Sequence, residues 1–270
     1  MQPVVLSIAG FDPSSGAGVT ADIKTAAAHG CFAVTCITSV TVQTTQGVRR
    51  VEPLRGEFVS ETLFEIAADL PIHAVRIGML GSGEVAGAVA AFLETTRPPN
   101  IVLDPILRSS SGTDLIDAKG AEILKKRLLP LATLVTPNLA EAAALTRLTV
   151  SGIDDMRSAG RELLRWGAGN AVITGGHLEG DAIDLLLWRP GGMEEVFEEE
   201  LRGERIHSSS THGTGCAFAT SVACHLARGF PIPEAVAGAK EFVRSAIEHA
   251  TPLGHGNGPM ELLWNLKGSK

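Results

Sequence analysis

The segment from Thr211 to Cys216 has the residue types of an anion-binding turn that carries one reactive side chain. Its two glycines, Gly213 and Gly215, let the backbone turn tightly and approach a ligand without a Cβ clash. The segment opens a helix-patterned run over 214–228, and the free N–H groups at a helix start favour an anion. A helix N-terminus also lowers the pKa of a thiol, so Cys216 could act as a base. The motif predicts a hole for a transferring phosphoryl group, and an ordinary glycine-rich helix cap is the alternative.

Carboxylates at two other places suit a metal ion. Asp104 ends a short apolar run, a natural position for a Mg²⁺ ligand or a base, although it could simply cap the next turn. Asn138 and Glu141 are spaced N-x-x-E at the start of a helix-patterned run, so both can face one ligand. The alternative for this pair is a helix N-cap with the glutamate at the third position.

Three further sites with polar or sulfur-containing side chains, or with free backbone N–H groups, follow predicted strands. Gly175-Gly176-His177 could hold phosphate through backbone N–H groups, or could be a plain turn. Gln43 offers both a donor and an acceptor, which suits the edge of a planar heterocycle. Met79 either packs on an aromatic ring or belongs to the core.

Short apolar runs that alternate with helix-patterned runs must position these residues. The alternation predicts βαβ units and a mostly parallel sheet, which binds ligands at the carboxyl ends of its strands. The predicted strands cover 4–9, 33–42, 73–77, 101–104, 132–135 and 171–174, with a late antiparallel portion over 183–188, 194–199 and 204–207. The predicted helices cover 19–29, 58–70, 84–95, 116–128, 139–145, 154–166, 214–228 and 233–250. No linker or repeat divides the chain, so we expect one domain over residues 1–270.

Composition excludes several classes of function. The 270 residues carry a net charge of −7 without a Lys/Arg block, which argues against nucleic acid or an anionic membrane as the main partner. No apolar run reaches the roughly 18 residues of a membrane span, and the start lacks a basic signal region, so we expect a cytoplasmic protein. G-x-G-x-x-G and the Walker lysine are absent, which disfavours a Rossmann NAD site. The four cysteines lack zinc or C-x-x-C spacing, so free thiols are expected.

The combination of motifs resembles the hydroxymethylpyrimidine/phosphomethylpyrimidine kinases of the ribokinase-like superfamily. The resemblance runs in register from about residue 4 to residue 260. It is carried by the stretch IAGFDPSSGAG at 8–18 with ADIKT at 21–25, by 38–47, IGML at 77–80, VLDP at 102–105, TPNLAEA at 136–142, GGH at 175–177, THGTGC at 211–216 and GHGNGP at 254–259.

The resemblance implies an α/β fold of three layers, a ribokinase-like sandwich whose mostly parallel central sheet is flanked by helices. It implies Mg·ATP-dependent phosphorylation of 4-amino-5-hydroxymethyl-2-methylpyrimidine and of its monophosphate, on the way to thiamine diphosphate. It also suggests a homodimer. Residue by residue, it places the pyrimidine at Gln43 with a pocket wall of Gly10, Ala17, Met79 and Leu107; the anion hole and base at Gly213, Gly215 and Cys216; ATP and phosphate at Asn138, Thr211, Thr214, Gly175 and Lys240; and Mg²⁺ at Asp104 and Glu141.

One position departs from the family pattern. The departure leaves open which group neutralises the negative charge of the phosphates. Many members have lysine immediately before Gly-Gly-His, whereas this chain has Thr174. His177, Lys240 or Arg108 could supply the missing positive charge. Without the lysine, the second phosphorylation could be the less efficient of the two. The alternatives to this kinase are a pyridoxal kinase of the same superfamily, a non-catalytic ligand-sensing domain, and an ATP-dependent dehydratase, against which Cys216 argues.

Overall fold

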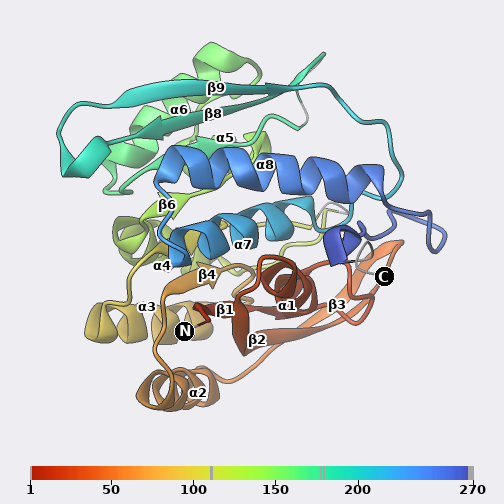
Figure 1. The fold of residues 1–270 in the computed structure, drawn as a ribbon. Coiled ribbons are helices and arrows are strands. Elements are labelled where there is room, and N and C mark those ends of the chain that lie inside the picture. Colours follow the sequence, from red (N-terminus) through yellow and green to blue (C-terminus); the bar gives the residue numbers. More distant parts are fainter. Residues whose placement is uncertain (1, 110–111, 177, 179, 267–270) are drawn as a thin grey trace.

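A computed structural model describes residues 2–109, 112–176, 178 and 180–266. Its centre is a nine-stranded sheet with the order β3-β2-β1-β4-β5-β6-β7-β8-β9 (Figure 1). The strands are β1 (Val4–Phe11), β2 (Phe32–Thr44), β3 (Gly47–Pro53), β4 (Ala74–Ile77), β5 (Ile101–Leu103), β6 (Leu134–Val135), β7 (Ala171–Ile173), β8 (Ala182–Trp188) and β9 (Phe197–Gly203). Strands β2, β1, β4, β5, β6 and β7 pair in parallel, and β3, β8 and β9 join antiparallel.

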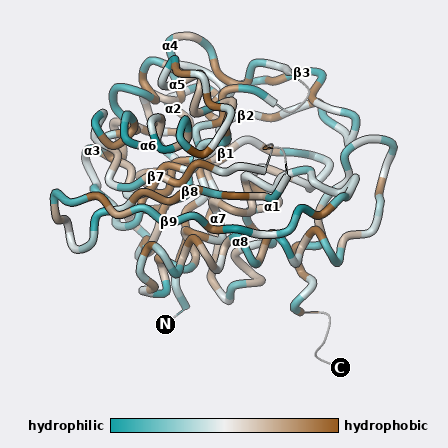
Figure 2. The backbone as a smooth tube through the Cα atoms, turned by 90° about the horizontal axis from the view of Figure 1, so that it is seen from above, coloured by the Kyte–Doolittle hydropathy of each residue, from teal (hydrophilic) through white to brown (hydrophobic). Residues whose placement is uncertain are grey.

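Helices cover both faces of this sheet because neighbouring strand residues point to opposite sides. Leu6 and Val75 pack into one core with α2 (Gly56–Asp69), α3 (Gly83–Thr96) and α6 (Ile153–Arg165). Val5 and Ala74, one residue earlier on the same strands, pack into a second core with α7 (Thr214–Ala227) and α8 (Ile232–Glu248). The apolar residues of the strands run through the middle of the molecule between polar outer segments (Figure 2). The remaining helices are α1 (Gly18–Ala28), α4 (Ala118–Ile123) and α5 (Leu139–Thr146).

Three predicted elements differ from the structure. The single helix expected over 116–128 is α4 followed by a π-helical turn, Leu124–Leu128. The strand expected at 194–199 overlaps β9 only at residues 197–199, and residues 204–207, expected as a further strand, lie beyond the end of β9 and form no strand. Strand β2 continues through Gln43 and returns as β3, a hairpin that the sequence patterns did not reveal. This hairpin lies at the sheet edge, where one face meets solvent, so its strands tolerate polar residues that read as a loop.

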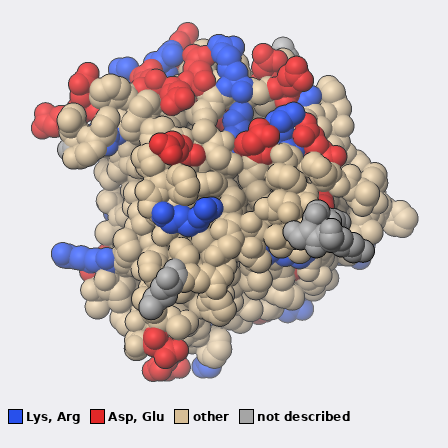
Figure 3. All heavy atoms as spheres, in the orientation of Figure 1, with Lys and Arg blue, Asp and Glu red and all other residues tan. Residues whose placement is uncertain are grey.

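Charged side chains protect the opposite edge of the sheet. Edge strand β9 carries Glu198, Glu199 and Glu200, and Arg157 of α6 contacts two of these glutamates. Charged groups gather over this region in Figure 3, at the top of the view. Charges on an edge strand discourage pairing with another chain. Within the described ranges, no helix is both long and apolar enough to cross a membrane.

Candidate active site

A cavity of about 1710 Å³ opens where the parallel strands end. The predicted site residues come from eight separate stretches of the sequence, yet all of them except Gly175 line this cavity. The residues lining it include Gly10, Ala17, Gln43, Met79, Asp104, Leu107, Asn138, Glu141, Thr211, Gly213, Thr214, Gly215, Cys216 and Lys240. The sequence therefore identified the location of the cavity through the ends of the strands.

The turn at 211–216 is held between two other loops. Gly213 has φ of 84°, and a Cβ there would lie 1.9 Å from the carbonyl oxygen of Gly16, so only glycine fits. The N–H of His212 donates to the Gly258 oxygen at 3.0 Å, and the N–H of Gly258 donates to Ser209 at 2.8 Å. Helix α7 starts at Thr214, so the N–H groups of its first turn have no partner within the helix, and its first residues line the cavity. This geometry agrees with the predicted anion hole.

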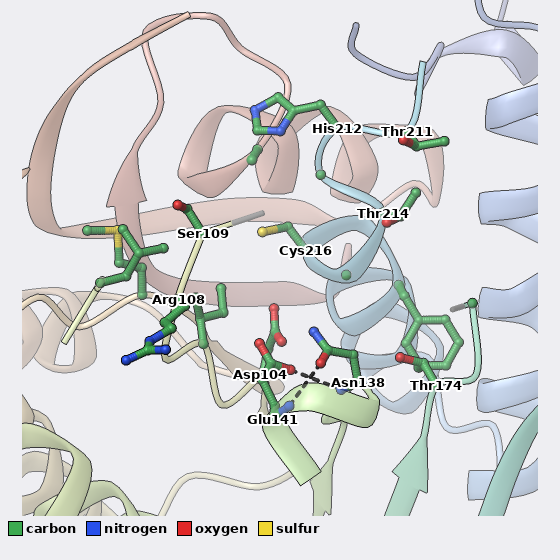
Figure 4. A pocket seen from close by; sticks show the side chains of 18 of the residues that line it. Asp104, Arg108, Ser109, Asn138, Glu141, Thr174, Thr211, His212, Thr214 and Cys216 are labelled. Carbon is green, nitrogen blue, oxygen red and sulfur yellow. Dashed lines mark hydrogen bonds between the residues drawn. The ribbon is translucent and has the colours of Figure 1, made fainter. Parts of the chain in front are cut away.

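Cys216 lies in the first turn of α7, and its side chain points toward the cavity in Figure 4. Burial raises the pKa of its thiol to about 11, and the carboxylates of Asp104 and Asp22 add to this rise. The Arg76 guanidinium and the Gly18 N–H act in the opposite direction but do not compensate. The expectation that the helix start lowers this pKa is therefore wrong for the free protein, because burial and two acidic neighbours outweigh it.

The guanidinium of Arg76 is fully buried and lies between the carboxylates of Asp22 and Asp104. Arg76 of β4 contacts Asp22 at 3.2 Å and Asp104 at 2.6 Å. Asp22 also accepts the hydroxyl protons of Ser7 at 2.5 Å and Thr220 at 2.7 Å. Gly78 leaves the space that this guanidinium occupies, since a Cβ there would lie 2.0 Å from Nη1. The sequence reasoning missed Arg76, and its only signal was a lone charge inside an apolar strand.

The Asn138–Glu141 pair is both a helix cap and part of the cavity wall. The Glu141 N–H donates to Asn138 Oδ1 at 3.0 Å, and the Asn138 N–H donates to Glu141 Oε2 at 2.9 Å, which is a capping box. The Glu141 and Asp104 side chains approach each other below the cavity (Figure 4). Burial raises the pKa of Glu141 to about 8, with a further rise from Asp104. Burial likewise raises the pKa of Asp104 to about 6.

Two buried carboxylates with raised pKa values are a donor set that suits a divalent cation, because the cation would relieve their repulsion. Among the described residues, no group of three or more His, Cys, Asp or Glu side chains could hold a metal alone. Mg²⁺ commonly uses one or two carboxylates and completes its shell with water and substrate phosphates. Asp104 and Glu141 therefore fit Mg²⁺ that arrives with a nucleotide.

The loop after β1 supplies a further acidic group, the carboxylate of Asp12. Asp12 Oδ1 accepts the N–H of Ser14 at 2.8 Å, and Oδ2 accepts the N–H of Ala17 at 2.9 Å. His212 Nε2 lies 2.8 Å from the same Oδ2 and 3.1 Å from Gln43 Nε2. Sequence reasoning missed His212 because a histidine inside a glycine-rich turn carries no pattern of its own.

The predicted phosphate cradle at 175–177 is arranged differently. The Gly175 N–H donates to Asp184 Oδ1 at 2.9 Å, so a phosphate would have to displace this bond. Lys240 Nζ contacts the other oxygen of Asp184 at 2.7 Å and the Ala182 carbonyl oxygen at 3.0 Å. His177 lies outside the described residues. The N–H of Thr174 bonds the Pro137 carbonyl oxygen at 2.9 Å.

Arg205 and Arg108 also line this cavity. Arg205 donates to the main-chain oxygens of Gly176, Leu178 and Gly180 and so holds the loop that follows β7. Arg108 pairs with Asp114 at 2.6 Å in an exposed position. Of the three cations proposed to replace the family lysine, Lys240 is thus paired with Asp184 and Arg108 with Asp114.

Known proteins are similar to this chain in sequence. The sequence pattern of the phosphomethylpyrimidine kinase family matches residues 12–261. The hydroxymethylpyrimidine/phosphomethylpyrimidine kinase of Streptomyces coelicolor is 42% identical over 264 residues, covering 98% of this chain and 96% of the relative. The thiamine biosynthesis bifunctional protein ThiED of Geobacter sulfurreducens is 41% identical over 95% of this chain, and the chain spans about half (51%) of that relative.

A solved structure establishes the architecture. The ADP complex of Bacillus subtilis pyridoxal kinase superposes with a TM-score of 0.86 at 31% identity, covering 97% of each chain. The predicted ribokinase-like fold, with its mostly parallel sheet between helices, is therefore confirmed. Together with the match over residues 12–261, these similarities show that the chain belongs to the phosphomethylpyrimidine kinase family.

Proposed function

We propose that this chain is an ATP-dependent kinase of 4-amino-5-hydroxymethyl-2-methylpyrimidine and its monophosphate in thiamine biosynthesis. The observation that carries the proposal is the common cavity of Gln43, the turn at 213–216 and the pair Asp104/Glu141. This cavity offers an amide to a heterocycle, and it offers helix N–H groups and carboxylates to a triphosphate. The named activity of the Streptomyces coelicolor relative, 42% identical over nearly its whole length, supports the same conclusion.

In this proposal, the chain itself contributes mainly position and charge. Phosphoryl transfer needs little covalent chemistry from the protein, so donors aimed at the transferring group dominate. The N–H groups at 213–216 stabilise the charge that develops on the phosphoryl oxygens, and Gln43 orients the ring. Asp104 and Glu141 would hold Mg²⁺, which supplies charge neutralisation to the triphosphate when bound.

Cys216 is proposed to take the proton of the substrate hydroxyl. With its pKa at about 11, the thiol is protonated in the free protein at neutral pH. A loose transition state puts little demand on an early proton transfer, because the phosphoryl group is already separating from its leaving oxygen. Arg76 lies beside Cys216 and favours the thiolate once the proton leaves.

A pyridoxal kinase is the second candidate, because the superposition with Bacillus subtilis pyridoxal kinase covers nearly the whole chain. The test is an ATP-consumption assay with the pyrimidine alcohol, its monophosphate and pyridoxal side by side. We expect the highest kcat/KM for the pyrimidine alcohol. A higher value for pyridoxal would replace the proposal, and turnover of the alcohol without its monophosphate would restrict it to the first phosphorylation.

The assembly is proposed to be a homodimer of single-domain chains that function in the cytoplasm. Support for a dimer comes from the edge hairpin, where Val40 and Val42 of β2 are 41% and 56% exposed. The continuous nine-stranded sheet supports a single domain. Light scattering coupled to size exclusion measures the mass directly, and a monomer at micromolar concentration would contradict the dimer.

A further inference from the structure

The imidazole of His212 lies between the carboxylate of Asp12 and the amide of Gln43. Both contacts use the same ring atom: Nε2 is 2.8 Å from Asp12 Oδ2 and 3.1 Å from the Gln43 side-chain amide. One ring nitrogen is either a donor or an acceptor, and never both at once. The partners of Asp12 and Gln43 therefore determine where the proton lies.

Asp12 is surrounded by donors. Its two oxygens accept the N–H and hydroxyl of Ser14 at 2.8 and 2.7 Å, and the N–H groups of Gly16 and Ala17 at 3.2 and 2.9 Å. Burial would raise the pKa of this carboxyl, but the bonds from His212 and Ser14 outweigh burial and lower it. An ionised carboxylate only accepts, so Nε2 of His212 must carry a proton and donate it. It follows that Nε2 cannot accept a hydrogen bond from an N–H of Gln43.

The other neighbour of the Gln43 amide leads to the same orientation. Thr41 Oγ1 lies 3.0 Å from the carbonyl oxygen of Phe11 and 3.2 Å from the atom of the Gln43 amide placed as Oε1. A carbonyl only accepts, so the single hydroxyl proton of Thr41 goes to Phe11. Toward Gln43 the hydroxyl must then accept. Thr41 therefore requires that the nitrogen of the Gln43 amide faces it, and His212 requires that the oxygen of the same amide faces it.

We propose that Asp12, His212 and Thr41 are positioning residues that fix the amide of Gln43 in one orientation, oxygen toward His212 and nitrogen toward Thr41, and thereby determine which ring the cavity accepts. The structure places Nε2 toward His212 and Oε1 toward Thr41, the reverse of this orientation. Oxygen and nitrogen of a glutamine amide have nearly the same shape, so proton partners rather than packing decide their order. The second lone pair of the oxygen and the second hydrogen of the nitrogen remain for a ligand in the cavity. The amide thus presents an acceptor and a donor in fixed order.

This order distinguishes the two candidate substrates, and this half of the inference rests on the proposed function. Next to its hydroxymethyl carbon, the pyrimidine carries an amino donor followed by a ring-nitrogen acceptor. At the matching edge, pyridoxal carries an aldehyde acceptor followed by a hydroxyl donor, which is the reverse order. A fixed amide therefore pairs with the pyrimidine and opposes this edge of pyridoxal, since a site built for one hydrogen-bond pattern rejects the opposite one.

The orientation itself is tested without substrate, by ¹⁵N NMR of the imidazole nitrogens in the free protein. We expect His212 Nε2 to be protonated at pH 8, where the Asp12 carboxylate is ionised. A bare Nε2 would overturn the assignment, because Nε2 would then accept from Gln43. This measurement does not depend on any kinase activity, so it stands even if the proposed function fails.

The selection is tested with substitutions at Thr41. Thr41→Val removes the acceptor while keeping the shape, and Thr41→Ser keeps the hydroxyl. We expect Thr41→Val to raise the KM of the pyrimidine about tenfold and to narrow its kcat/KM advantage over pyridoxal, with the KM of ATP unchanged. Thr41→Ser should restore both values. Thr62→Val is the matched control, because Thr62 also donates to a carbonyl, that of Phe58 at 2.8 Å, but lies on α2 outside the residues that line the cavity.

Two results would overturn the selection. One is an equal rise in KM for ATP and for the pyrimidine, which would indicate general disturbance of the cavity. The other is identical behaviour of Thr41→Val and Thr41→Ser, which would remove the hydroxyl from the argument. If the unsubstituted protein phosphorylates neither ring, the proposed function and the selection fall together, and the NMR result alone decides the amide orientation.

Discussion

Arg76 Nη2 lies 2.6 Å from Asp104 Oδ2, with the guanidinium fully buried and the carboxylate almost so. The same guanidinium faces Cys216 and contacts Asp22, so one positive charge serves three acidic groups. The proposed metal ligand and the proposed base are therefore electrostatically coupled. A change in charge at Asp104 alters how strongly Arg76 favours the Cys216 thiolate.

Removing this cation should cost far more stability than removing an exposed one. Arg76→Met leaves two buried carboxylates without their partner, and we expect a loss of about 3–5 kcal/mol in the free energy of unfolding. The control is Arg50→Met, because Arg50 contacts Glu52 at the same 2.6 Å but both side chains are more than half exposed. An exposed pair contributes about 0–1 kcal/mol. Urea unfolding at pH 7 compares them, and similar losses would contradict the role given to burial.

The thiol of Cys216 should be unreactive toward alkylation at neutral pH in the free protein. With a pKa of about 11, the thiolate fraction rises with pH and is largest above that value. We expect the rate of iodoacetamide modification to increase about tenfold for each pH unit between 7 and 10. Peptide mass spectrometry locates the label, and Cys216→Ser is the blank. A plateau already below pH 8 would show that the anion hole lowers the pKa after all.

Turnover should depend on this thiol more than substrate binding does. Cys216→Ala removes the proposed base but leaves Gln43 and the cavity wall in place, so kcat should fall about 10²–10⁴-fold with little change in the KM of the pyrimidine. Steady-state kinetics measure both constants. Cys36→Ala, a buried thiol outside the cavity, serves as the control. Unchanged kcat in Cys216→Ala would remove the residue from the mechanism.

Substitution at Gly213 should disrupt the turn because of its backbone conformation. A Cβ at Gly213 would lie 1.9 Å from the Gly16 oxygen at φ of 84°, whereas a Cβ at Gly215 meets nothing within 4 Å. We expect Gly213→Ala to lower kcat/KM about 100-fold or more, and Gly215→Ala to lower it less. Steady-state kinetics with thermal unfolding as a folding check measure this. The reverse ranking would show that side-chain space around the ligand matters more than strain in the free turn.

The two carboxylates should make stability fall as pH rises. The pKa values of Glu141 and Asp104 are about 8 and about 6 in the folded state, against 4.5 and 3.8 as reference values. The folded protein therefore binds more protons than the unfolded chain across this interval, and the free energy of unfolding decreases with pH. We expect Glu141→Gln to flatten the decrease between pH 5.5 and 8, with exposed Glu57→Gln as control. Denaturant titrations at several pH values measure it, and parallel curves for all three proteins would contradict the raised pKa of Glu141.

Sequence reasoning located the site through a property of parallel sheets. Asp104 follows an apolar strand, and Asn138 begins a helix directly after another strand, so both had to reach the same edge. The hairpin of β2 and β3 was not predicted, because its residues alternate between solvent and the cavity rather than between core and solvent. Its register depends on pairing across the edge, which a single strand pattern does not contain.

Electrostatic environment was the part that sequence could not supply. The helix start suggested a low pKa for Cys216, but Asp22 and Asp104, from distant parts of the chain, reverse that direction. Likewise, the Gly175 amide looked available for phosphate until Asp184 proved to be its partner. Both facts depend on side chains brought together by the fold, so no local pattern predicts them.

Residues 254–258, which follow α8, have a consequence for how the cavity is completed. The His212 N–H bonds the Gly258 oxygen, and Cβ atoms at Gly254 and Gly256 would collide with Thr45 and its neighbours on the β2–β3 hairpin. Residues 254–258 therefore connect the earliest and latest parts of the cavity wall. A nascent chain on the ribosome can form β1, α1 and most of the sheet, yet its cavity remains incomplete until this stretch has emerged. The cavity wall is therefore complete only when the earliest and the latest parts of the chain have both folded.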